Sequence, residues 1–248
     1  MALKTWALTL ALTGSALAAR ADPRLDEVVY SPYIENRVVE LETRLGQEIG
    51  AGDEQNARTV VIEAEAGVSD RLSVALVGSV ERESGGSRLT GLGLESRYYV
   101  GQVPVIGVDV GLYAEVTKGL AGENGGGEAK LLLARTEGRF QGLVNLIVER
   151  PFGAPTGEEF ASYGYAASAT WRTVGSLRIG AEAFGDLGDD HGLGAQGAYV
   201  GPQIKWEGRP GRSPFEIGVD AGWLAAVGPA RREASSQARI NLEIERRF

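Results

Sequence analysis

The feature that most constrains the fold is an alternation of apolar and polar residues, repeated in long stretches to the end of the chain. In residues 58–68, for example, one face carries valine, isoleucine and alanine, and the other carries two glutamates. Successive side chains of a β-strand point to opposite faces, so this period predicts strands with one apolar and one polar face. Twelve strands are predicted, at residues 38–48, 58–68, 71–82, 89–100, 105–118, 128–136, 139–149, 161–173, 177–184, 195–207, 214–224 and 236–248.

The connections between these segments alternate in length. Residues 69–70 and 137–138 are short turns, whereas residues 48–57 and 225–236 are long polar loops. Most of the strands are long enough to cross a bilayer when tilted, and the alternation of turns and loops is typical of outer-membrane barrels. The predicted fold class is therefore all-β: a transmembrane antiparallel up-and-down β-barrel of about twelve strands, over residues 38–248. A secreted soluble β-sandwich also has one apolar and one polar face and is the competing fold.

The side chains on the apolar face of the predicted strands suit a lipid environment. Arg135 and Arg246 are exceptions on this face, and both lie near strand ends. The free-energy cost of an arginine against lipid drops from about 2–4 kcal/mol at the bilayer midplane towards zero at the interface. Alanines also share this phase, which lipid accepts and a soluble core would replace with larger side chains. Aromatic residues gather near strand ends, as in the girdles of membrane barrels: Tyr98, Tyr163, Trp171, Trp206, Phe215 and Trp223.

The amino-terminal residues have the pattern of a secretory signal peptide. Lys4 precedes a short apolar run, and small residues permit cleavage after Ala18 or Ala21. We assign residues 1–21 to the signal peptide, residues 22–37 to an N-terminal periplasmic segment, and the remainder to the barrel. The chain has no cysteine, which excludes a disulfide framework and a cysteine-linked lipid anchor.

The carboxyl-terminal stretch "INLEIERRF" resembles the last strand of bacterial outer-membrane β-barrel proteins. That resemblance implies an assembly signal at Ile240, Leu242, Ile244 and Phe248, read by the barrel-assembly machinery, and pairing of the last strand with the first. Arg246 departs from the usual apolar residue. The stretch "DEVVYSPYIENRVVELETRLG" is similar to the start of uncharacterised proteobacterial outer-membrane proteins, some of them channel- or transporter-like. The resemblance places the chain in the bacterial outer membrane, with lipid and lipopolysaccharide as its surroundings.

If the apolar phase faces lipid, the other phase lines the lumen, and acidic residues outnumber basic ones there. The predicted lumen-lining residues are Glu63, Glu65, Glu95, Arg97, Asp109, Glu115, Arg178, Glu182, Glu216, Asp220, Arg239 and Glu243. Twelve strands enclose more space than the eight whose side chains fill the interior, which predicts a narrow passive channel for small solutes. The acidic excess favours cationic or neutral solutes. The alternative is a structural or surface-interaction barrel whose lumen is sealed by a Glu/Arg network.

Other functions receive less support. The formal net charge of -8 argues against nucleic acid as a partner. The chain has one histidine, His191, in a Gly-rich loop predicted over residues 185–194, and the role of that loop stays open. Asp189 precedes it with the Asp-x-His spacing of barrel proteases, and Ser162 or Ser168 could partner it by phase, so an outer-membrane hydrolase is the least favoured hypothesis. No catalytic residue, metal site or cofactor is predicted, and the solute is not identified.

Overall fold

The computed structural model describes Leu25 and residues 27–50, 58–83, 86–120, 122–153, 160–232 and 234–248. The signal peptide predicted over residues 1–21 lies outside the described residues. The strands are β1 (Val38–Ile49), β2 (Arg58–Gly67), β3 (Leu72–Glu83), β4 (Gly86–Val103), β5 (Val108–Gly119), β6 (Gly125–Glu137), β7 (Phe140–Phe152), β8 (Ser162–Arg172), β9 (Arg178–Asp189), β10 (Gly192–Gly208), β11 (Phe215–Val227) and β12 (Ser236–Arg247). A 3-10 helix, η1 (Gly228–Arg232), lies between β11 and β12. No helix in the described part of the chain is long and apolar enough to cross a membrane.

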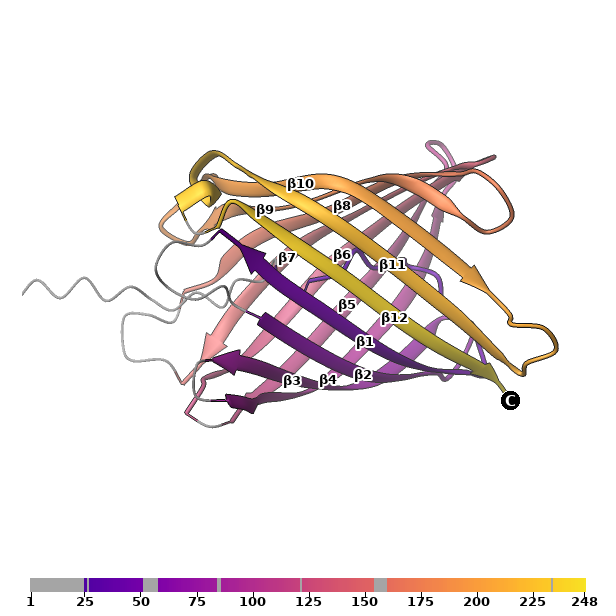
Figure 1. Cartoon of the computed structure of the whole chain (residues 1–248), viewed down its shortest axis with the longest axis horizontal. Coiled ribbons are helices and arrows are strands. Elements are labelled where there is room, and N and C mark those ends of the chain that lie inside the picture. Colours follow the sequence, from indigo (N-terminus) through magenta and orange to yellow (C-terminus); the bar gives the residue numbers. More distant parts are fainter. Residues whose placement is uncertain are drawn as a thin grey trace, which may run out of the picture.

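The twelve strands form a closed antiparallel barrel in which each strand pairs with its sequence neighbours (Figure 1). β1 and β12 complete the ring, with Val38 opposite Arg247 and Ile49 opposite Ser236. A closed barrel leaves no unpaired edge, which is the requirement for crossing lipid with strands. The predicted fold is confirmed, and each predicted segment overlaps one observed strand.

The two ends of the barrel differ. The short-turn rim holds the turns 68–71, 104–107, 138–139, 173–177 and 209–214, and the opposite end is the long-loop rim. The predicted loop over residues 185–194 is wrong. β9 continues to Asp189 and β10 starts at Gly192, which leaves a turn of Asp190 and His191. Pairing with the flanking strands overrides the low strand propensity of glycine here, and the ladder absorbs the glycines through a register shift between Leu193 and Gly197.

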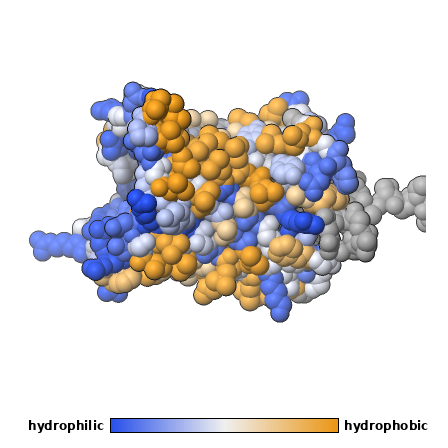
Figure 2. All heavy atoms as spheres, turned by 180° about the vertical axis from the view of Figure 1, so that it is seen from behind, coloured by the Kyte–Doolittle hydropathy of each residue, from blue (hydrophilic) through white to orange (hydrophobic). Residues whose placement is uncertain are grey.

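The outer wall is apolar, as the alternation predicted. Leu76 and Leu94, paired across β3 and β4, are 65% and 64% exposed. Figure 2 shows apolar side chains over much of the wall and hydrophilic side chains towards both ends of the barrel. Exposure of this kind is unfavourable in water and favourable against lipid tails, so the wall is the surface of a membrane-spanning barrel.

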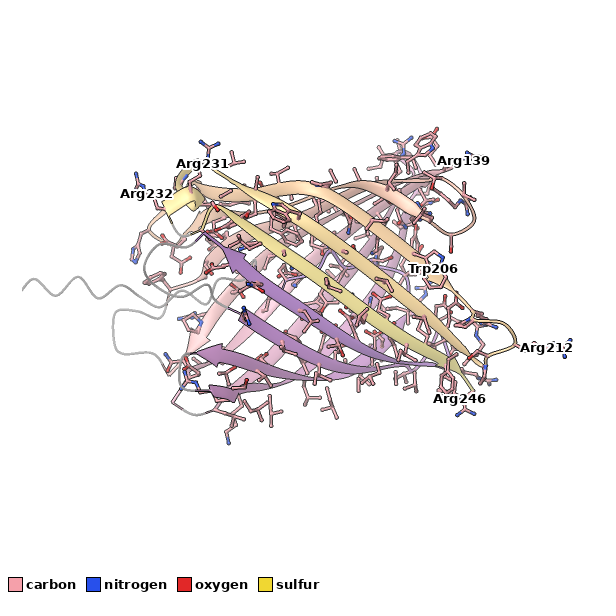
Figure 3. All side chains as sticks on the ribbon, in the orientation of Figure 1. Arg139, Trp206, Arg212, Arg231, Arg232 and Arg246 are labelled. Carbon is pink, nitrogen blue, oxygen red and sulfur yellow. The ribbon has the colours of Figure 1, made fainter. Side chains whose placement is uncertain are left out.

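Arginines frame this apolar wall at both rims. Arg231 lies at the long-loop rim, whereas Arg139, Arg212 and Arg246 lie towards the short-turn rim (Figure 3). Trp206 lies nearer the short-turn rim and is 41% exposed, as expected of an interfacial aromatic residue. Long cationic side chains at these depths reach the headgroup region, so the exceptions to the apolar phase carry little cost.

The interior is occupied by the chain's own amino-terminal part, here called the N-terminal segment (Leu25 and residues 27–37). Leu25, Glu27 and Tyr30 are 4%, 6% and 5% exposed, and the segment contacts inward-facing residues of several strands. It turns at Arg37, whose φ is 61°, and continues into β1. The prediction of a separate periplasmic segment over residues 22–37 is therefore corrected, because its described part packs within the barrel.

Candidate functional site: a lumen occupied by the N-terminal segment

A row of glutamates crosses the inner wall from one rim to the other. Each glutamate lies directly opposite the next one on a neighbouring strand, except on β3, where Ala75 lies between two of them. This acidic row consists of Glu216, Glu245, Glu40, Glu65, Glu95, Glu115, Glu128 and Glu149. It starts near the short-turn end of β11 and finishes near the long-loop end of β7, because the strands are tilted. Like charges directly opposite one another destabilise a sheet, so the row requires counter-charges.

Three buried cations of the wall supply part of that counter-charge. The ion pairs join Arg44 to Glu42 and Glu63, Arg97 to Glu65, and Lys130 to Glu128. The side chains of the three cations are 11%, 12% and 3% exposed, respectively. Buried ion pairs are strongly destabilised when one partner is removed, so this network holds its geometry firmly.

Tyr30 of the N-terminal segment lies at the centre of this network. Its hydroxyl accepts a hydrogen bond from Arg44 Nη2 at 2.6 Å and donates one to Glu95 Oε2 at 3.1 Å. Its ring centroid is 4.9 Å from that of Tyr113 and 4.8 Å from Lys130 Nζ. The segment therefore supplies a hydrogen-bonding group and an aromatic face to the charged residues of the wall.

Two further wall residues bind the backbone of the segment and one of its carboxylates. Asn145 of β7 is fully buried; its Oδ1 accepts the Tyr30 amide at 2.7 Å and its Nδ2 donates to the Tyr30 carbonyl at 2.9 Å. Lys130 Nζ donates to Glu27 Oε1 at 2.5 Å. These bonds replace the hydrogen bonds that the segment's polar groups would otherwise make with water.

Glycines in the wall make room for the segment's main chain. A Cβ at Gly46 would lie 2.1 Å from the carbonyl oxygen of Leu25, and one at Gly67 would lie 1.9 Å from that of Glu35. No side chain fits at such distances, so these wall positions require glycine while the segment is docked. The two glycines of the wall are therefore needed for the segment to dock.

The lumen also has an apolar side, which the predicted polar phase did not include. Val28 packs on Tyr113 and Leu132. Val29 packs on a buried cluster contributed by β7 to β11 and η1: Ile147, Ala166, Phe184, Tyr199, Leu224, Ala226 and Ala230. Apolar side chains therefore share the lumen with the predicted charged ones. Inward positions can be apolar because the N-terminal segment and η1 cover them and exclude water.

No protein-family model and no curated protein matches the chain. Among solved structures, an outer-membrane channel from Pseudomonas putida F1 superposes with a TM-score of 0.57 at 13% sequence identity, over 92% of this chain and 99% of that chain. The chain has the fold of an outer-membrane channel. The KdgM porin, solved with disordered oligogalacturonate, gives a TM-score of 0.49 at 11% identity, over 84% of this chain and 99% of that chain. At these identities the likeness concerns the fold.

The predicted lumen residues all take inward positions, and two sets of them meet inside this channel fold. Glu63, Glu65, Glu95 and Arg97 gather around Tyr30. The second set comprises Glu182, Asp220 and Arg239, which line a cavity beside the N-terminal segment together with Asn241.

The other predicted lumen residues lie closer to neighbours of their own. Asp109 accepts hydrogen bonds from the hydroxyls of Tyr33 and Tyr99 at 2.7 and 2.6 Å. Glu115 accepts one from the Tyr113 hydroxyl at 2.7 Å, and Glu243 accepts one from Asn241 Nδ2 at 2.8 Å. The remaining two, Glu216 and Arg178, lie at the short-turn rim. Glu216 forms an ion pair with Arg209, and Arg178 Nη1 lies 3.4 Å from the Arg139 carbonyl.

The carboxyl-terminal residues follow the predicted pattern in space. Ile240, Leu242 and Ile244 point outward and are 45%, 42% and 46% exposed. The Phe248 amide donates to the Arg37 carbonyl at 3.0 Å, next to the β1–β12 seam. The predicted pairing of the last strand with the first is confirmed, whereas recognition of these residues by the assembly machinery stays a prediction.

His191 lies in the exposed turn between β9 and β10. Its amide donates to Asp189 Oδ1 at 2.9 Å, and its ring centroid is 5.0 Å from that of Phe160. Ser168 is buried in the barrel and donates to Gln203 Oε1 at 2.7 Å. Within the described ranges, no serine hydroxyl is hydrogen-bonded to the imidazole, so the geometry offers no Ser–His pair for nucleophilic catalysis.

Among the residues that the structure describes, carboxylates come close enough together to share an ion at two places on the inner wall. One group is Glu40, Glu42 and Glu243, and the other is Glu63, Glu65 and Glu95. In the second group Glu63 and Glu65 already pair with Arg44 and Arg97, respectively. Guanidinium groups therefore supply in that group the counter-charge that a metal ion would bring.

Proposed function

We propose that the protein is an outer-membrane channel for small cationic or neutral solutes, closed in this state by its N-terminal segment. The observation that carries the proposal is that the segment occupies the lumen, whereas the ring of strands is complete without it. Each strand is hydrogen-bonded to a neighbour on both sides without the segment. The barrel therefore remains complete when the segment leaves, and a twelve-stranded barrel is wide enough for a narrow wet path.

Release of the segment would uncover charged groups of the wall. Glu95 loses the Tyr30 hydroxyl, and Lys130 loses Glu27 while keeping Glu128. The acidic row then faces water along the length of the barrel. Carboxylates along a pore attract cations and repel anions, which supports a cationic or neutral solute.

A permanently sealed barrel is the second candidate. It is favoured by the burial of the ion pair that joins Glu27 of the segment to Lys130 of the wall, whose side chains are 5% and 3% exposed. Separation of a buried pair costs about 3–5 kcal/mol when either partner stays buried and unpaired. The two candidates differ only in whether the segment undocks under working conditions.

A reversible tether separates them, because the chain has no native cysteine to interfere. An ideal Cβ at Gly111 lies 2.8 Å from the Cβ of Pro32, against about 3.8 Å in a disulfide, so a small displacement of the segment allows the bond. The variant carrying Pro32→Cys and Gly111→Cys is refolded and recorded in planar bilayers. We expect silence when it is oxidised and cation-selective openings when it is reduced.

The single variant Pro32→Cys is the matched control and should not respond to reductant. Steady openings of the oxidised double variant would contradict closure by the segment. Silence of the wild type and of the reduced double variant, both in a heat-modifiable folded form, would favour the sealed structural barrel.

A further inference from the structure

Three arginines meet at the short-turn rim, where Figure 3 shows Arg139. Arg172 of β8 lies directly opposite Arg178 of β9, and the Arg172 amide donates to the Arg139 carbonyl at 2.9 Å. Arg178 Nη1 lies 3.4 Å from the same carbonyl. The neighbouring Trp171 and Ile179 are 52% and 50% exposed on the outer wall, so Arg172 and Arg178 take the inner face, at the mouth of the lumen. We call these three residues the arginine cluster.

The arginine cluster has no acidic partner. Within the described part of the chain, none of its members forms an ion pair with a carboxylate. The nearby charges are paired among themselves: Glu137 contacts Arg135 at 2.9 Å, and Lys205, which lies opposite Arg178, contacts Asp220 at 3.1 Å. Like charges directly opposite one another destabilise a sheet, so a bound anion would remove an unfavourable interaction from this rim.

A buried hydroxyl group lies beside the cluster, one inward position further into the barrel. Thr170 precedes Arg172 by two positions on β8, so both side chains are on the same face of the strand. Thr170 is 2% exposed, and its Oγ1 has no hydrogen-bond partner among the described residues. Gln141 of β7 lies directly opposite it. A buried hydroxyl without a partner is costly, and this one is a free donor next to three cations, which an anion with several oxygens would satisfy.

We propose that the arginine cluster and Thr170 bind the phosphate group of a small water-borne solute at the short-turn mouth of the lumen. A guanidinium group can hold two oxygens of one phosphate, and several of them match the double charge of a monoester. A lipid phosphate fits less well, because Thr170 lies on the inner face of the barrel. The inference goes beyond the proposed function. At this rim the N-terminal segment contacts Gly67 of β2 and Gly111 of β5, so the site does not require the segment to leave.

The test is a titration of the refolded mature chain, in an uncharged detergent, with ethyl phosphate observed by phosphorus NMR. It is run at about pH 8, where the monoester is almost fully ionised. We expect saturable binding by the wild type and a loss of at least about tenfold in affinity for Arg172→Gln, because a hydrogen bond between two charged groups is removed. Arg212→Gln is the matched control. It removes the same charge from another part of the same rim (Figure 3) and should bind as the wild type does.

Absence of binding by the wild type would overturn the proposal. Equal losses in Arg172→Gln and Arg212→Gln would also overturn it, because they would show attraction by net charge alone. Thr170→Val keeps every charge and should weaken binding by a smaller factor; unchanged binding would contradict the role of the hydroxyl. Binding of dihexanoylphosphatidylglycerol without binding of ethyl phosphate would replace the solute site by a lipid site. Each variant is compared in its heat-modifiable folded form, and no current is measured, so the result does not depend on whether the channel opens.

Discussion

Replacement of Glu27 by glutamine should release the N-terminal segment while leaving the barrel wall unchanged. Glu27 is 6% exposed, and its Oε1 accepts a hydrogen bond from Lys130 Nζ at 2.5 Å. Lys130 keeps a second partner, Glu128 Oε1, at 3.0 Å. No charge of the wall is therefore left unpaired, and the substitution acts on docking alone.

The expected change in the docking equilibrium follows from the kind of bond that is lost. A hydrogen bond to a charged group contributes about 1.5–3 kcal/mol, and each 1.36 kcal/mol is a tenfold change. The ratio of undocked to docked segment should rise roughly 10- to 150-fold. Lys130→Met should act more strongly, because it leaves Glu27 and Glu128 buried without their cation, at a cost of about 3–5 kcal/mol.

Two measurements report on docking. One is the open fraction in single-channel recordings. The other is the rate at which a cysteine introduced by Ser31→Cys reacts with a membrane-impermeant thiol reagent, in a chain that has no other cysteine. Glu137→Gln is the matched control, because Glu137 pairs with Arg135 at 2.9 Å with both side chains exposed, where such pairs contribute little. Equal open fractions and labelling rates in the wild type, Glu27→Gln and Lys130→Met would refute the reasoning.

Four further changes have definite outcomes. Gly67→Val should raise the open fraction, because a Cβ there meets the Glu35 carbonyl oxygen at 1.9 Å; Gly78→Val, whose Cβ has no neighbour closer than 3.7 Å, should not. Leu76→Arg should lower the free energy of unfolding in lipid vesicles by about 2–4 kcal/mol, whereas Val105→Arg in a short turn should have little effect. Phe248→Ala should reduce the amount of barrel assembled in cells and leave refolding in detergent unchanged, if the residue acts as a signal. Hydrogen bonds from the Ala161 amide, the larger cause, and from the Tyr163 hydroxyl lower the pKa of the Asp190 carboxyl group. They therefore stabilise this turn at neutral pH, and the stabilisation is lost as the pH falls through the lowered pKa. Asp190→Asn should remove this pH dependence, measured as amide exchange at Ala161.

The alternation in the sequence was enough to predict the barrel. A period of two is a local property of the chain, and strands such as Val38–Ile49 and Ser236–Arg247 expose apolar residues at alternate positions over much of their length. Loop boundaries were less predictable at the β9–β10 turn. The many glycines there indicated a loop, but pairing with neighbouring strands, which the composition does not encode, extended both strands.

The contents of the lumen depended on the tertiary structure. The sequence placed Glu63, Glu95 and Arg97 on the inner face, because face follows from phase. It did not indicate that Tyr30 would be their partner: Glu95 is 65 positions away from Tyr30, and Asn145 is 115 positions away. Nor did the alternation indicate that Gly46 and Gly67 make room for the main chain of the segment. Only closure of the sheet brings these distant strands around one segment, and that closure decides which charges pair.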